Sequence, residues 1–156
     1  MAGVKISTVI DAIAALSVTL SNGKALRILQ DDTIPEDATR LGGVLFPKPG
    51  GFVSGFTVEP QTYGKDGAER MDVRYILTYT FCDIPAGSNR SLGDNYTAVV
   101  QDTALILNQI LTNDDLSDGI DFRLADVINF GAVQDPAGNW FYGAELQFSV
   151  TEFYEV

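Results

Sequence analysis

The sequence predicts a single α+β domain spanning residues 1–156, in which two helices pack on one face of a mainly antiparallel sheet. Two long alternating runs, 71–81 and 140–156, predict the sheet, because period-two alternation is typical of a strand with one buried face. Two other runs, 5–17 and 95–111, repeat apolar residues at helical spacing. The length suits one domain with a substantial core, and no internal repeat divides the chain.

The first part of the chain predicts one helix followed by short, interrupted segments. Residues 5–17 place apolar side chains on one helical face, with Ser7 or Thr8 available as the N-cap. Residues 25–29 fit either a short strand or the tail of a helix. The apolar run 43–46 is followed by a stretch rich in proline and glycine, which ends it.

Two strands are predicted in the middle of the chain. Residues 52–58 alternate until Pro60 ends the run, which predicts a strand near a sheet edge. The polar residues 61–69 predict a loop. The run 71–81 has one apolar face, which comprises Met71, Val73, Tyr75, Leu77, Tyr79 and Phe81.

The last part of the chain predicts a helix and a terminal hairpin. Asp94 can cap a helix over residues 95–111. Residues 122–134 predict a strand, and turn-forming residues join it to the final strand, so the two should form a hairpin. The face of the final strand that we expect to be buried comprises Trp140, Tyr142, Ala144, Leu146, Phe148, Val150, Tyr154 and Val156.

The residue types present argue against catalysis and cofactor binding. The chain contains no histidine, which is the usual general base and the commonest metal ligand. Its single cysteine, Cys82, lies in a strand-like run and is interpreted as a packing residue. No phosphate-binding or dinucleotide fingerprint is present, and no pattern singles out a catalytic carboxylate pair. We therefore expect a protein that is not an enzyme and uses no cofactor.

An acidic segment at residues 113–121 is similar to a calcium-binding loop only in outline. With Asp114 as the first ligand, Gly119 falls correctly at the sixth position of an EF-hand loop, but Leu116 and Ala125 occupy positions that need oxygen ligands. Solvated surface is the better interpretation, and no metal site is expected. The formal net charge of −11 also disfavours binding to nucleic acid and to anionic membranes.

The order of elements in this small, acidic, histidine-free chain resembles that of the tail terminator proteins of long-tailed bacteriophages, and more coarsely that of neck or head–tail completion proteins. The resemblance covers nearly the whole chain. It rests on the helix at residues 6–16, the strand MDVRYILTY at 71–79, and the helix at 96–111 followed by paired strands that include GNWFYGAEL at 138–146. The resemblance implies no catalytic residue.

The resemblance implies a structural virion protein that assembles in the host cytoplasm. Its copies are expected to form a closed ring, a hexamer, at the head-proximal end of the tail tube. There the ring ends tube polymerisation and joins the tail to the head. The expected partners are further copies of the chain, the tail tube protein and a neck or head-completion protein. DNA is expected to pass through the ring without specific binding, and no membrane is involved.

Residues 44–58 are predicted to form a projecting arm that mediates the ring contacts. Within this arm Phe46, Phe52, Phe56 and Val58 are the expected subunit-interface residues, because aromatic anchors commonly fill grooves of a partner. The alternative is that the phenylalanines are ordinary core residues beneath a hairpin.

Acidic side chains are expected to line the channel or a loop surface, because an acidic wall does not bind DNA phosphates. The candidates are Asp66, Glu69, Asp114, Asp115 and Asp118. The alternative is that these carboxylates only maintain solubility.

Three other functions are compatible with the sequence. A neck or completion protein shares the order of elements, and a tail tube subunit would form long tubes in place of closed rings. A small-ligand-binding module would be a monomer with a pocket near Tyr75, Tyr79 and Trp140.

Overall fold

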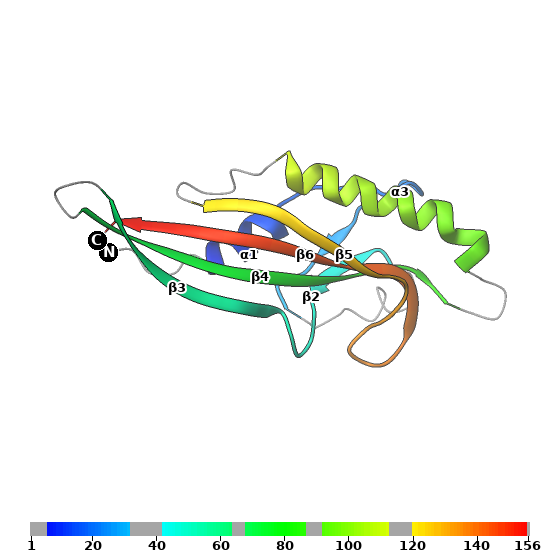
Figure 1. Ribbon diagram of the computed structural model, residues 1–156. Coiled ribbons are helices and arrows are strands. Elements are labelled where there is room, and N and C mark those ends of the chain that lie inside the picture. The colour runs from blue at the N-terminus through cyan, green and yellow to red at the C-terminus, as the bar shows by residue number, and fades with distance from the viewer. Residues whose placement is uncertain (1–5, 32–41, 64–67, 87–91, 113–119, 156) are drawn as a thin grey trace.

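A computed structural model describes residues 6–31, 42–63, 68–86, 92–112 and 120–155 (Figure 1). Within these residues the fold is α+β, as predicted, with six strands in one sheet and two helices on one side of it. In chain order the elements are α1 (Ile6–Ala14), β1 (Arg27–Ile28), β2 (Val44–Pro47), β3 (Val53–Tyr63), β4 (Ala68–Pro85), α3 (Leu92–Leu111), β5 (Ile120–Gln134) and β6 (Trp140–Glu155).

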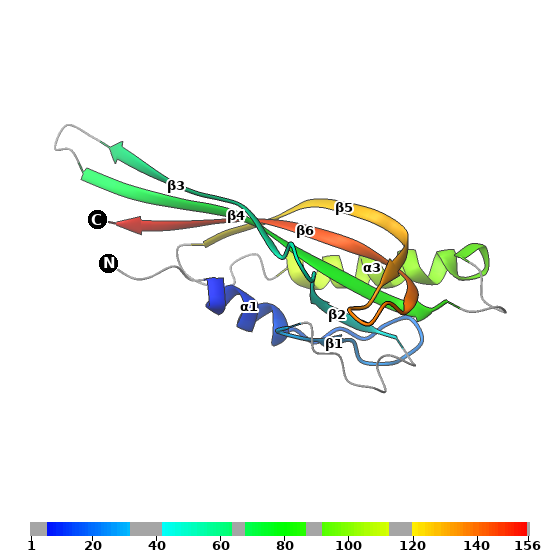
Figure 2. The same cartoon turned by 90° about the horizontal axis from the view of Figure 1, so that it is seen from below.

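The sheet is organised around β4, an 18-residue strand that pairs with β2, β3 and β6. The strand order is β1-β2-β4-β6-β5, with β3 added to β4 on the same side as β2. Only the β1–β2 pair is parallel among these pairings. Strands β3 and β5 therefore lie at opposite edges, and the far ends of β3, β4 and β6 extend beyond both helices (Figure 2).

The main core lies between the helices and one face of the sheet. Val9 and Ile13 of α1 and Ile106 and Ile110 of α3 pack there against alternate residues of β4 and β6. The strand residues are Val73, Tyr75, Leu77, Tyr79 and Phe81 of β4, with Ala144, Leu146, Phe148 and Val150 of β6. The predicted facing is confirmed for the β4 run, and for β6 from Ala144 to Tyr154, whereas Val156 lies outside the described residues.

The start of β6 differs from the prediction. Trp140 is 54% exposed, whereas its neighbour Phe141 is buried. The β4–β6 register shifts between Cys82 and Ile84, where β4 carries one extra residue and β6 does not, and Phe141 is buried in a second cluster with Cys82. At the other end of β6, the alternation brings Glu152 into the buried face, where the hydroxyl of Tyr154 donates a hydrogen bond to its carboxylate.

The strands also extend further than predicted into residues 61–69. Strand β3 continues through Pro60 to Tyr63, and β4 begins at Ala68. Within the described part of the chain β3 pairs only with β4, and an edge strand tolerates a proline that lacks an N–H group. The choice left open for residues 25–29 resolves as the short strand β1.

Candidate functional site

A short strip of exposed apolar side chains lies on β3. It comprises Val53, Phe56 and Val58, whose side chains are 39%, 48% and 47% exposed. Val58 pairs with Val73, so both side chains share the face of the sheet that the helices cover elsewhere. The ring of Phe56 stacks on Tyr75, with 5.7 Å between centroids and 15° between planes. The β3 strip therefore continues the apolar core out to the surface.

The local sequence of this strip is uncharged and irregular. Ser54, Gly55 and Thr57 separate its three members, so residues 53–58 carry no charge in a chain with 31 charged residues. The register against β4 shifts between Ser54 and Thr57, and Gly55 adopts a φ of 60°, which favours glycine. The edge strand β3 therefore has a β-bulge at the position of Phe56. Contiguous exposed apolar side chains of this kind mark interaction surfaces.

The predicted arm residues divide between this strip and the core. Phe46 is wholly buried in β2, in a second cluster with Val44, Cys82, Val133 and Phe141. The expectation that Phe46 contacts a neighbouring subunit is therefore wrong. All four residues of β2 are buried, so this short strand has no solvent-facing side that alternation can reveal.

Phe52 lies just before β3 and is partly buried. Its ring meets Tyr79 edge to face, with 5.2 Å between centroids. Phe52 therefore anchors the beginning of β3 on the core, while Phe56 and Val58 remain accessible. Of the four predicted interface residues, the structure brings only Phe56 and Val58 together on an exposed surface.

The predicted acidic surface falls almost entirely outside the described residues. Asp66, Asp114, Asp115 and Asp118 lie there. Glu69 belongs to β4, where its backbone pairs with Thr62, but its side chain is outside the described set. An acidic channel lining stays a prediction.

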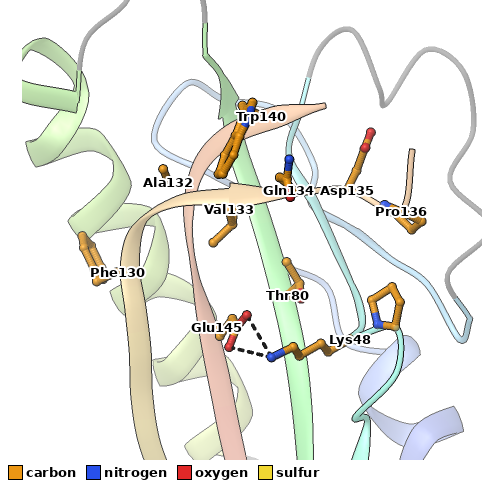
Figure 3. Close-up of a pocket in the computed structure, with 11 residues that line it drawn as sticks. Lys48, Thr80, Phe130, Ala132, Val133, Gln134, Asp135, Pro136, Trp140 and Glu145 are labelled. Atoms are coloured by element: carbon orange, nitrogen blue, oxygen red, sulfur yellow. Dashed lines mark hydrogen bonds and ion pairs between the residues drawn. The ribbon is translucent and has the colours of Figure 1, made fainter. Parts of the chain in front are cut away.

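A groove of about 560 Å³ lies on the side of the sheet opposite the helices (Figure 3). Its lining includes Lys48, Thr80, Phe130, Ala132, Trp140 and Glu145. Figure 3 shows the Lys48–Glu145 ion pair at one end and Trp140 at the other. The Lys48 Nζ atom lies 3.3 Å from Glu145 Oε1. The volume falls within the range of about 300–1,000 Å³ that is typical of binding pockets.

Sequence reasoning missed this groove because Trp140 was expected on the buried face. The expected ligand pocket near Tyr75, Tyr79 and Trp140 is also wrong, because both tyrosines are buried on the helix-facing side. The register of β5 against β6 shifts between Ile128 and Gly131, and this irregularity adjoins the residues that form the groove.

A buried carboxyl pair lies on the helix side of the sheet. The pKa of Asp83 is raised to about 9. Burial is the largest cause, and a hydrogen bond to Asp102 and the charge of that residue raise the pKa further. The backbone N–H of Ser21 donates to Asp102 Oδ1 at 2.7 Å. Asp83 of β4 thus holds a proton at neutral pH and helps to join β4 to α3.

The thiol of Cys82 is also buried. Desolvation raises the pKa of the Cys82 thiol, so this sulfur is protonated at neutral pH and packs as an apolar group. In the described part of the chain, no group of three or more acidic or cysteine side chains is placed to hold a metal ion.

No helix of the described residues has the length and apolar character needed to cross a membrane. No protein-family model matches the sequence, and no curated protein matches it.

Proposed function

We propose that this chain is a structural virion protein that forms a ring at the head-proximal end of a phage tail tube. The ring ends tube polymerisation and joins the tail to the head. One observation carries this proposal: the uncharged β3 strip, with Phe56 and Val58 about half exposed, lies on an edge strand of the sheet. A free-standing monomer gains nothing from such a surface, whereas a subunit buries it against a neighbour.

Charge supports the same assembly. With a net charge of −11, the chain repels the phosphates of DNA that passes through the ring. The same charge opposes close contact between copies. An uncharged contact surface at residues 53–58 reduces that repulsion where subunits meet.

The proposal is tested by polymerising purified tail tube subunits, from the genome that encodes this chain, with and without the protein. Negative-stain images should show shorter tubes with a ring at one end. Tubes built from this chain alone would identify a tail tube subunit instead. Binding to the head connector without any effect on tube length would identify a neck protein.

A further inference from the structure

We propose that the outward side of α3 in one copy packs on the β3 strip of the next copy, so that each ring contact lays a helix on a neighbour's sheet. This inference rests on the proposed function and names the contact that builds the ring. On α3 three large apolar side chains are about as exposed as those of the strip: Tyr96 at 51%, Val100 at 40% and Leu105 at 39%.

The outward side of α3 carries no charge. Its exposed side chains, which we call the α3 face, are Tyr96, Thr97, Val100, Gln101, Ala104, Leu105 and Asn108. The only charged residue between positions 95 and 112 is Asp102, which is buried. A surface helix normally carries charged residues on its outer side, and 20% of the residues in this chain are charged. An uncharged outer face with exposed apolar side chains therefore indicates an interaction surface.

The β3 strip lies on the face of the sheet that packs against helices. Val53 pairs with Leu77, which is buried in the main core. Val58 pairs with Val73, which is buried in the same core. The strip itself stays 39–48% exposed beside these core residues. Because an apolar sheet face is buried by packing another element on it, a helix from a second copy would extend the helix layer over the strip.

The two surfaces have matching lengths. From Tyr96 to Asn108 the α3 face runs for about 18 Å, at a rise of about 1.5 Å per residue. From Val53 to Val58 the strip runs for about 16 Å, at a rise of about 3.3 Å per residue. One helix face can therefore cover the whole strip.

The two surfaces lie on different parts of the molecule. Helix α3 packs on β4, β5 and β6, whereas β3 lies at the edge of the sheet opposite β5, and the two are well separated in Figures 1 and 2. Ile106 and Ile110 hold α3 in its own core, so a chain cannot place its own α3 on its own strip. Each copy therefore offers one helix face and one strip, which is what a closed head-to-tail ring requires.

Charge favours a second copy as the occupant. Two chains that each carry a net charge of −11 meet with least repulsion where the local charge is low. Residues 53–58 and the α3 face are both uncharged. The buried carboxylate of Asp102 accepts a hydrogen bond from the backbone N–H of Ser21 at 2.7 Å, so it does not take part in the contact. The pairing therefore brings no carboxylate of one copy against a carboxylate of the other.

Two variants with matched controls test the contact. Ala104→Glu places a charge in the centre of the α3 face, and Ala15→Glu makes the same change at an exposed alanine just after α1. Val58→Glu alters the strip, and Thr57→Glu changes the opposite face of the same strand, where Thr57 pairs with Arg74. By light scattering, Ala104→Glu and Val58→Glu should each reduce the ring to a monomer, whereas both controls should assemble like the wild type.

A milder variant separates loss of contact from loss of fold. Gln101→Glu adds a charge to the α3 face with almost no change in side-chain shape, so its far-UV circular dichroism should match that of the wild type. Its rings should form only at higher protein concentration. Assembly at the wild-type concentration would overturn a contact through the α3 face.

Mixing the two defective variants gives the sharpest result. The Val58→Glu chain keeps an intact α3 face and the Ala104→Glu chain keeps an intact strip, so the mixture can form one correct contact but no ring. Size-exclusion chromatography with light scattering should detect a dimer of twice the 16.9 kDa chain mass. Such a dimer would also show that both variants are folded.

Three outcomes would count against the proposals. A mixture that stays monomeric although circular dichroism shows both variants folded would overturn the pairing. Rings from either variant alone would also overturn it, because a contact between two α3 faces needs no strip and a contact between two strips needs no α3 face. In both cases wild-type rings would leave the proposed function intact. A wild-type chain that stays monomeric alone and with tail tube subunits would overturn the proposed function as well.

Discussion

Alanine substitutions at Phe46 and Phe56 distinguish a core residue from a surface residue within one short segment. Phe46 is wholly buried, so Phe46→Ala should lower the free energy of unfolding by about 3–5 kcal/mol. Phe56 is 48% exposed, so its truncation forfeits only about half of the 1.5–3 kcal/mol of a fully buried side chain. Loss of the stack on Tyr75 adds up to about 1 kcal/mol. Phe56→Ala should therefore cost about 0.8–2.5 kcal/mol.

Urea unfolding followed by far-UV circular dichroism measures both losses, at protein concentrations where light scattering reports a monomer. Phe141→Ala is the matched control, because Phe141 is buried in the same cluster as Phe46 and should cost as much. Equal losses at Phe46 and Phe56 would refute the reasoning that burial divides this segment into a core part and a contact part.

Three further substitutions test the sheet and the buried carboxyl pair. Leu146→Ala should lower the free energy of unfolding in urea by about 2–5 kcal/mol. Gln147→Ala, on the opposite face of β6, should change it by about 0.5 kcal/mol or less. Similar losses at the two positions would reject the facing of β6. Gly143→Ala should strongly lower the melting temperature, because a Cβ atom there would lie 1.8 Å from the carbonyl oxygen of Phe81; an unchanged melting temperature would contradict this close approach. Folded Asp83 keeps its proton up to a pKa of about 9, whereas the unfolded chain releases it near its ordinary value of 3.8, so this residue should make stability fall as pH rises between those values. The decline should reach about 1.4 kcal/mol per pH unit and should lessen in Asp83→Asn; identical pH profiles of the two proteins would count against a buried neutral carboxyl.

The long strands could be predicted because their alternation is uninterrupted. From Val73 to Phe81 and from Ala144 to Val150, each inward side chain is apolar and each strand pairs regularly with its neighbour. In such segments the hydrophobic pattern alone determines which face is buried. Glu152 breaks the pattern, because a hydrogen bond from Tyr154 allows a carboxylate to occupy an inward position.

The contact surfaces could be predicted only in part, because they depend on tertiary structure. Phe46 and Phe56 both belong to the predicted arm, but only Phe46 lies in a strand whose residues are all buried. Trp140 is exposed as the first residue of β6, although the alternation of the strand places it with the inward residues Ala144 and Leu146. The groove brings together Lys48, Thr80 and Glu145 from separate segments, so it has no signature in any one of them.

The central claim is that copies of this chain close into a ring, and the mass of the purified protein in solution tests it most directly. Light scattering of the protein, measured alone and in a mixture with tail tube subunits, should report a single oligomer of a few copies, expected to be six. Negative-stain images of the same samples should show closed rings. A mass of 16.9 kDa in both samples at every concentration would contradict the account.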